Sequence, residues 1–307
     1  MRSLSLIFSL GLFWTSLACG ANSASNLASN LAVSLAINAE SANLPNSVPA
    51  PATIKEWCAP LLPRLPSLSL AECQQIELSR SGQLSPQGFP LFIRDFPVAH
   101  AKGKKSVTRV LMLGGIHGDE LSASSLVFKW LLQMQKSQTH EFHWKVAPLL
   151  NPDGLLAKKP SRTNARGVDL NRNFPSPNWA QDAPRYWEQR TKRDPRRYPG
   201  PAEVSEIETR WVVDLIEKFK PHVIISVHAP FGVLDLDGPA DPPLRFGRLL
   251  YKPVGVYPGS LGNYSGLNKK IPVLTIELPH ASRLPDPKEM QGIWQDMQTW
   301  IRKNLAP

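Results

Sequence analysis

Two shortages limit what this chain can be: it has few cysteines, and its apolar stretches are short. Only three of the 307 residues are cysteine, and Cys58 and Cys73, which lie fifteen positions apart, do not have a zinc-ligand spacing. The apolar stretch from Leu6 to Trp14 is shorter than the ~20 residues that a transmembrane helix needs. We therefore expect no cysteine-based zinc module and no transmembrane segment. Internal repeats are absent as well.

The charge balance is basic, but no nucleic-acid-binding motif accompanies it. The formal net charge is +10 at pH 7 and the pI is near 9.6, which favours an anionic partner or surface. Much of the excess lies between Arg185 and Tyr198, a segment with six basic residues against two acidic ones. This segment could bind a polyanion, but we favour a solvated insertion loop, because most charge runs are solvated. We predict no nucleic-acid partner.

The N-terminus has the pattern of an export signal. Arg2 is followed by a short apolar stretch and then by small residues, so we predict a signal peptide over residues 1–21. The protein would then be periplasmic or extracellular. A lipid anchor at Cys19 is the less favoured alternative, because Ser16 stands where a lipoprotein signal has an aliphatic residue.

Composition divides the rest of the chain into a tether and one domain. Residues 22–52 are rich in Ala, Ser and Asn and are expected to form a flexible linker. Residues 53–307 contain no second linker and are predicted to form a single domain. If the chain is exported, Cys58 and Cys73 should form a disulfide, which would stabilise the fold by ~3 kcal/mol.

Apolar runs alternate with stretches of helical spacing along this domain. The pattern predicts an α/β fold with a mixed, mostly parallel central sheet and helices on both faces. The predicted elements are a hairpin over 76–95, strands over 107–113, 142–150, 223–227 and 271–278, and helices over 121–134, 202–219 and 287–305.

Three of the predicted strands end in residues that can do chemistry. His117 and Glu120 follow the strand over 107–113, and their i,i+3 spacing lets both side chains reach one cation. His228 and Glu277 stand at the ends of two later strands. In open α/β sheets, sites form beyond the strand ends, so we expect these four residues to converge.

A second motif and the order of all the motifs resemble the zinc carboxypeptidase family. The motif runs from Arg162 to Pro175 as Arg-Thr-Asn-Ala-Arg-Gly-Val-Asp-Leu-Asn-Arg-Asn-Phe-Pro. Together with His117-Gly-Asp-Glu, Asn151-Pro-Asp-Gly and Thr275-Ile-Glu, it follows the family's order over roughly residues 75 to 280. The export signal and a Gly-Ser-Leu-Gly before the last strand look most like the bacterial murein peptide amidases. Those enzymes cleave the bond between γ-D-glutamate and diaminopimelate.

The resemblance implies a zinc ion and a general base. His117, Glu120 and His228 would bind one Zn²⁺ per chain and leave a position open for water or a substrate carbonyl. Glu277 would take the proton from water and pass it to the leaving amine.

The same resemblance implies how the substrate would be held. Arg162 would stabilise the oxyanion, while Asn171 and Arg172 would bind the substrate's free carboxylate. Asp169 would accept a hydrogen bond from His117 and orient its ring.

A tyrosine on a mobile loop before the glutamate strand assists the leaving group or binds substrate in the family's peptidases. Tyr264 is the nearest candidate here, and Tyr257 is the second. The interval from Tyr264 to Glu277 is shorter than in the digestive enzymes, which leaves this assignment open.

The sequence thus predicts an exported zinc metallocarboxypeptidase that hydrolyses an amide next to a free carboxylate. The expected substrate is the γ-D-glutamyl-diaminopimelate bond of peptidoglycan peptides, and the basic segment 185–197 could help attract such peptides. Two alternatives stay open: a zinc-dependent N-deacylase of acylated amino acids, and a catalytically silent protein that binds wall peptides.

Overall fold

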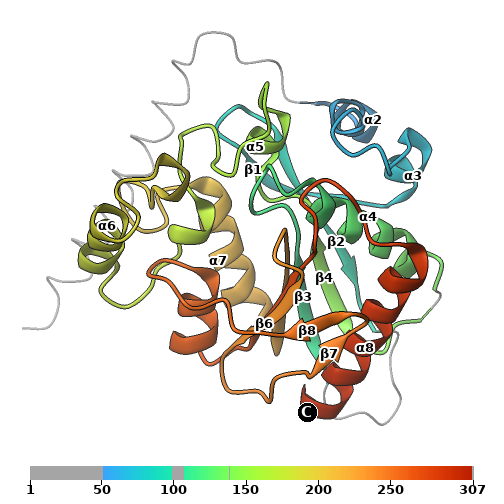
Figure 1. Ribbon diagram of the computed structural model, residues 1–307. Helices are drawn as coiled ribbons and strands as arrows, with labels where there is room; N and C mark the ends of the chain where they lie inside the picture. Colours follow the sequence, from blue (N-terminus) through green and yellow to red (C-terminus); the bar gives the residue numbers. More distant parts are fainter. Residues whose placement is uncertain (1–50, 99–106, 138, 306–307) are drawn as a thin grey trace, which may run out of the picture. The chain divides into compact units, whose positions relative to one another are not determined.

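A nine-stranded mixed sheet organises the chain in the computed structural model, which describes residues 51–98, 107–137 and 139–305 (Figure 1). The predicted signal peptide, Cys19 and nearly all of the predicted linker lie outside these residues. The strands follow one another in space as β1-β2-β4-β3-β5-β9-β6-β8-β7. Their bounds are β1 Ser79–Leu84, β2 Pro90–Phe96, β3 Arg109–Leu113, β4 His143–Ala147, β5 Val223–His228, β6 Val233–Asp237, β7 Arg245–Phe246, β8 Leu249–Tyr251 and β9 Val273–Glu277.

Parallel pairing is concentrated in the centre of this sheet. Strands β4, β3, β5 and β9 run parallel, and antiparallel pairs flank them on both sides. The predicted mixed sheet is confirmed, but four of the eight pairings in the described residues are antiparallel. Every residue of β5 is buried, as expected for a central strand that is covered on both faces.

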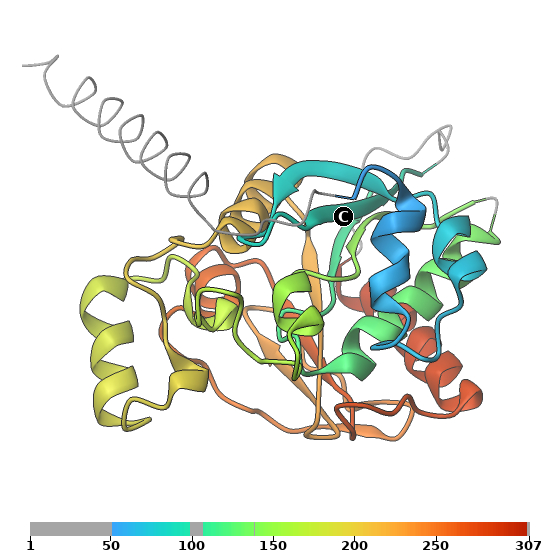
Figure 2. The same ribbon diagram turned by 90° about the horizontal axis from the view of Figure 1, so that it is seen from above.

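Helices cover both faces of the sheet, as predicted. The bounds are α2 Ile54–Cys58, α3 Leu70–Gln75, α4 Leu121–Gln135, α5 Pro152–Leu156, α6 Trp179–Gln189, α7 Ile207–Phe219 and α8 Pro287–Leu305, with short 3₁₀ turns η1 Ala59–Leu61, η2 Leu170–Arg172 and η3 Pro195–Arg197 and a π-helix η4 Gly262–Asn268. Helices α4 and α8 (green and red) pack on one face, and α7 (gold) packs on the other (Figure 2). None of the helices in the described part of the chain is both long and apolar enough to cross a membrane.

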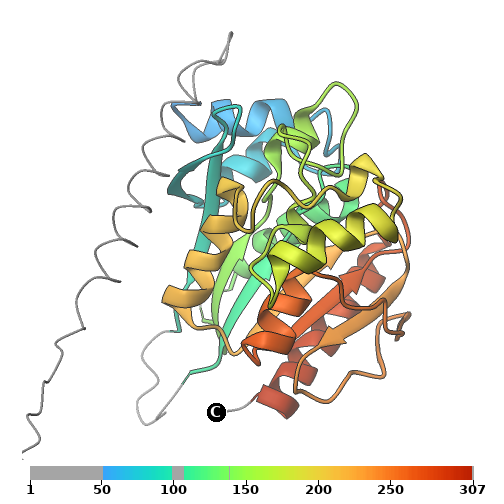
Figure 3. The ribbon, with the colours of Figure 1, turned by 90° about the vertical axis from the view of Figure 1, so that its left-hand side faces the viewer.

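The basic segment is less loop-like than predicted. Trp179–Gln189 form helix α6, which lies on the same side of the sheet as α7 and η4 (Figure 3). Trp179 and Ala183 are buried, and they anchor a helix whose other residues are largely polar. Of the six basic residues of the segment, only Arg185 lies on this helix, and the other five lie after Gln189, on the loop and the short turn η3.

Helices α2 and α3 are joined by the predicted disulfide between Cys58 and Cys73. Both cysteines are fully buried in the hydrophobic cluster on the α4 and α8 side of the sheet. Thr53 and Ser69 each begin one of these helices with a capping box, in which the hydroxyl and a glutamate three residues later satisfy free backbone N–H groups.

Candidate active site and metal centre

Two strand ends and one helix start bring the predicted metal ligands together. His117 follows β3 after a glycine turn, Glu120 immediately precedes α4, and His228 is the last residue of β5. At Gly115 the turn has a φ of +63°, and a side chain there would collide with Ser124. A glycine is therefore required for the sharp turn that carries His117 over the end of the sheet.

The three side chains form a compact donor set that fits a zinc ion. One donor atom from each of His117, Glu120 and His228 lies within 4.8 Å of the others, and all three residues are buried. The Nδ1 atom of His117 lies 2.7 Å from one Glu120 oxygen, and the Nδ1 atom of His228 lies 3.0 Å from the other. Two imidazole nitrogens and one carboxylate oxygen are typical of catalytic zinc sites.

Asp169 contacts both His117 and Arg162 behind the donor set. Its Oδ1 lies 3.2 Å from Nε2 of His117, and its Oδ2 accepts a hydrogen bond of 2.9 Å from Nε of Arg162. Burial raises the pKa of Asp169, but Arg162 and His117 outweigh this effect and hold its pKa well below the usual range. An ionised Asp169 fixes the His117 ring so that its Nδ1 faces the other ligands.

Arg162 is held as a charged group beside the metal ligands. One terminal nitrogen of its guanidinium lies 3.5 Å from Glu120. Burial would lower its pKa, but Asp169 and Glu120 outweigh burial and raise it. The Asn151 amide donates to the Arg162 carbonyl at 3.1 Å, so the Asn-Pro-Asp-Gly turn supports the loop that carries this arginine.

Glu277 lies next to the metal ligands but is not part of the set. It is the register partner of His228 on the neighbouring strand, and it is 7% exposed. Burial raises its pKa, and the nearby Glu120 adds to this effect, although His228 partly offsets it. A carboxylate with a raised pKa next to a metal site is suited to act as a general base.

Asn171 and Arg172 lie on the short turn η2 and face the same pocket. Asn171 accepts a hydrogen bond from the Leu261 N–H, so its own NH₂ group is left for a ligand. Arg172 is 5% exposed, the Tyr257 ring lies 4.4 Å from its guanidinium carbon, and no described residue forms an ion pair with it. Burial, together with Arg162, lowers the pKa of Arg172 to about 10, so it is still a cation at neutral pH.

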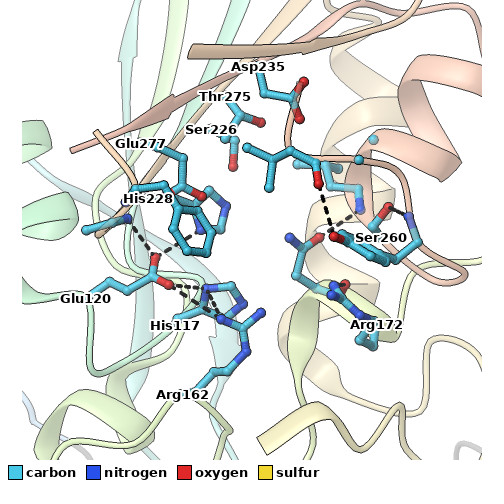
Figure 4. A pocket seen from close by; sticks show the side chains of 18 of the residues that line it. His117, Glu120, Arg162, Arg172, Ser226, His228, Asp235, Ser260, Thr275 and Glu277 are labelled. Atoms are coloured by element: carbon cyan, nitrogen blue, oxygen red, sulfur yellow. Dashed lines mark hydrogen bonds and ion pairs between the residues drawn. The ribbon is translucent and has the colours of Figure 1, made fainter. Parts of the chain in front are cut away.

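Seven of the predicted site residues line one pocket of about 400 Å³. Figure 4 shows Glu277 and the metal ligands on one side of the pocket and Arg172 on the opposite side. The predicted residues that line it are His117, Glu120, Arg162, Asn171, Arg172, His228 and Glu277. A buried cation thus lies across the pocket from the His117, Glu120 and His228 donor set and the carboxyl group of Glu277.

Comparison with known proteins agrees with this geometry. The family model of zinc carboxypeptidases matches residues 75–233, just over half of the chain. The chain belongs to the zinc carboxypeptidase family. It is therefore a peptide hydrolase, and its cofactor is zinc, for which His117, Glu120 and His228 are the fitting ligands.

Two relatives within this family carry the same name. Murein peptide amidase A of Vibrio campbellii is 31% identical over 185 residues, which cover 58% of this chain and 72% of the relative. Murein peptide amidase A of Escherichia coli is 35% identical over 127 residues, which cover 41% of this chain and only half of the relative. Carboxypeptidase A from Helicoverpa armigera has a TM-score of 0.54 at 15% identity and covers 81% of this chain and 70% of its own, which shows the shared fold.

The structure places the predicted tyrosine away from the pocket. The Tyr264 hydroxyl donates to Glu217 at 2.9 Å, and its ring packs in the hydrophobic cluster on the α7 side of the sheet. The π-helix η4 turns this side chain towards α7, which its distance along the chain from Glu277 could not reveal. Tyr257, the second candidate, lines the pocket instead.

Sequence reasoning missed a set of polar residues in the pocket. Ser226 and Thr275 lie two positions before His228 and Glu277 and share their face of the sheet. Asp235 and Asp237 also line the pocket, from a strand that was not predicted. The period-two spacing of these residues was a signal that could have revealed them.

Proposed function

We propose that this protein is an exported zinc metallocarboxypeptidase that releases a C-terminal residue from peptidoglycan-derived peptides. The bond would be the γ-D-glutamyl-diaminopimelate amide. The observation that carries the proposal is the buried guanidinium of Arg172, which has no ion-pair partner among the described residues and faces the pocket that holds Glu277. A planar guanidinium fork fits the free carboxylate next to the scissile amide.

The geometry supports a water-attack mechanism. A zinc ion bound to His117, Glu120 and His228 would polarise the substrate carbonyl and lower the pKa of a water molecule towards neutrality. Glu277 accepts a proton from water as the new carbon–oxygen bond forms. Arg162 donates to the oxygen on which negative charge develops, a role in which one donor contributes ~3 kcal/mol.

The second half of the reaction returns the proton. As the carbon–nitrogen bond breaks, the proton on Glu277 moves to the leaving amine, and the carboxylate is regenerated. Asn171 and Arg172 keep the substrate's free carboxylate on the opposite side of the pocket, which sets the scissile amide beside Glu277. Binding at two points lowers the entropic cost of reaching this geometry.

Two observations support wall peptides as the substrate: the names of two relatives and the positive charge of arginines that line the pocket. Both relatives described above are named murein peptide amidase A. Arg196, which forms an ion pair with Asp119, and Arg197 line the pocket, and their positive charges would attract anionic peptides. The predicted signal peptide and the Cys58–Cys73 disulfide support export, because disulfides persist in oxidising compartments.

The experiment is mass spectrometry of defined peptides before and after treatment with zinc-loaded protein. We expect release of diaminopimelate from L-alanyl-γ-D-glutamyl-diaminopimelate and no release of amino acid from N-acetylated amino acids. A chelator-treated sample is the control. Cleavage of the acylated amino acids alone would support the N-deacylase, and binding without any cleavage would support a silent wall-peptide-binding protein.

A further inference from the structure

The arginines that line the pocket differ in whether an acid of the protein neutralises them. The four arginines are Arg162, Arg172, Arg196 and Arg197. Arg162 forms an ion pair of 2.9 Å with Asp169. Arg196 forms one of 2.8 Å with Asp119. Arg172 and Arg197 form no ion pair with any residue that the structure describes. Two guanidinium groups of the pocket are therefore left for an anionic ligand.

The short turn η3, which carries Arg197, is fixed to two walls of the pocket. Before Arg197, the side chain of Arg196 pairs with Asp119, which stands in the loop of the metal ligands. After Arg197, the Tyr198 carbonyl accepts a hydrogen bond of 2.8 Å from the N–H of Asp169. The backbone of Arg197 is thus held between the loop of the metal ligands and the start of the turn η2.

Arg197 also lies near Arg172. The side-chain amide of Asn173 donates to the Pro199 carbonyl at 2.8 Å, so the chain after η3 packs along η2. Burial lowers the pKa of Arg172, and the positive charges of Arg162 and Arg197 add to this effect. Arg197 is half-buried, which limits the screening of its charge by water. Since like charges repel, this pair of unpaired cations favours the binding of anionic groups.

The proposed substrate carries two free carboxylates close to the scissile amide. One is the terminal carboxylate of the released residue, which Arg172 binds in the proposed mechanism. The other is the α-carboxylate of D-glutamate, which stays free because the amide is formed through the γ-carboxyl group. Four bonds of about 1.5 Å join the carbon of this α-carboxylate to the scissile carbonyl carbon, so it lies up to roughly 5 Å away. A peptide that is linked through its α-carboxyl groups has only the terminal carboxylate there.

We propose that Arg197 binds the α-carboxylate of the γ-linked glutamate and so makes the enzyme specific for γ-glutamyl amides. This inference rests on the proposed function, because Arg172 and Glu277 define where the scissile amide lies. Two unpaired guanidinium groups in the pocket then have one substrate carboxylate each. The planar guanidinium of Arg197 can form two charge-assisted hydrogen bonds with the carboxylate. An uncharged acyl group would leave this arginine without a counter-charge.

The test uses two tripeptides that differ only at this carboxylate. L-Alanyl-γ-D-glutamyl-diaminopimelate has the free acid, and L-alanyl-D-isoglutaminyl-diaminopimelate has a primary amide in its place. We expect kcat/KM of the zinc-loaded protein to be higher for the acid by about 10-fold or more. Arg197→Gln should bring the ratio of the two values close to one by lowering kcat/KM for the acid. Arg197→Lys keeps the charge but not the planar fork, so it should keep part of the ratio.

A matched control separates a contact with the carboxylate from long-range attraction. Arg190→Gln removes a charge from an exposed position of the same segment that does not line the pocket, and it should leave the ratio unchanged. An equal loss of the ratio in the Arg190 and Arg197 variants would assign the preference to general charge and overturn the contact. An unchanged ratio in Arg197→Gln would overturn it too, whether or not both rates fall, because Arg197 would then not distinguish the two acyl groups.

A second measurement keeps the inference separate from the proposed function. If the wild type cleaves both tripeptides at equal rates, the subsite is overturned and the peptidase stays in place. If it cleaves neither, the proposed function fails, and calorimetry with L-alanyl-D-glutamate and L-alanyl-D-isoglutamine decides the subsite. Both dipeptides keep the γ-carboxylate and differ only at the α-carboxylate. Tighter binding of the glutamate dipeptide that is lost in Arg197→Gln would support the subsite, and equal binding of the two would overturn it.

Discussion

Glu120 and Glu277 are two buried carboxyl groups in the same pocket whose pKa values are shifted in opposite directions. Burial raises the pKa of Glu120, but His117 and His228 outweigh it and hold that pKa well below the usual range. Burial also raises the pKa of Glu277, and there the nearby charges do not reverse the effect. Environments that separate two pKa values in this way mark different roles. Glu120 is therefore suited to stay ionised as a ligand, and Glu277 is suited to exchange a proton.

Replacing Glu277 with Gln tests this division of roles. The amide keeps the shape of the side chain but cannot accept the proton, so we expect kcat to fall by about 10²–10⁴-fold. The zinc content should stay at one ion per chain, because Glu277 is not in the donor set. The measurements are steady-state kinetics on the γ-D-glutamyl-diaminopimelate peptide and elemental analysis. Glu77→Gln, with its side chain 67% exposed, is the matched control and should keep full activity. Retained turnover in the Glu277 variant would remove this residue from the mechanism.

Residues that end buried strands could be predicted, and residues that depend on helix geometry could not. His117, His228 and Glu277 each follow an apolar run, and the ends of parallel strands meet at one edge of a sheet. Tyr264 was chosen by its distance along the chain, which does not say which side of a helix faces the pocket. Asp235 was missed because β6 is a short strand whose partners lie far away in the sequence.

At the scale of elements, the spacing of apolar residues predicted the long helices well, but it did not reveal a helix in a mostly polar segment. Helix α8 spans Pro287–Leu305 as predicted, because a wide apolar face and a proline at its start both mark it. Helix α7 starts at Ile207 instead of Ala202, since Val204 has a φ of +48°, which a right-handed helix does not allow. Residues 185–189, the last part of helix α6, were expected to belong to a solvated loop, because most of the helix is polar and its two buried anchors are too few to give a periodic signal.

The disulfide pairs two helices that are too short to be stable by themselves. Helices α2 and α3 have five and six residues, well below the ~12–15 that an isolated helix needs. Replacing Cys58 and Cys73 together with Ala should lower the free energy of unfolding by about 3 kcal/mol, the loop-closure value for fifteen residues. Urea unfolding measures the difference, and wild-type protein treated with a reductant should match the variant. Activity at low temperature should be retained, because the pair packs in the hydrophobic cluster on the other face of the sheet from the pocket. Equal unfolding curves for variant and wild type would show that packing alone holds the two helices.

At the scale of the whole molecule, the loop that carries Arg162 rests on a buried acidic cluster. The Asn164 amide donates to Glu206 at 2.8 Å and lies 3.4 Å from both oxygens of Glu208. Burial raises the pKa of Glu208 to about 8, and the nearby Asp153 and Glu206 add to the shift. At neutral pH the folded protein thus keeps a proton on Glu208 that the unfolded chain releases. This proton links the stability of the whole fold to pH.

The sign of this link follows from the two pKa values. A glutamate in an unfolded chain has a pKa of about 4.3, whereas burial places that of folded Glu208 at about 8. Between these values the folded state binds more protons than the unfolded state, so stability falls as the pH rises, by about 1.4 kcal/mol per pH unit from this group. Below pH 4 the group contributes no slope.

Glu208→Gln should remove this slope, because the amide is neutral at every pH and can still hydrogen-bond as the protonated acid does. We expect the variant and wild type to have similar melting temperatures near pH 4 and the variant to be clearly more stable at pH 8. Thermal unfolding of the zinc-loaded proteins across pH 4–8 measures this, with Glu203→Gln at an exposed position as the matched control. The control should follow the wild type at each pH. If the Glu208 variant exceeds the wild type in melting temperature by the same amount at pH 5 and pH 8, Glu208 is ionised in the folded protein. The Asn164 amide would then contact two charged carboxylates beneath the loop that carries Arg162.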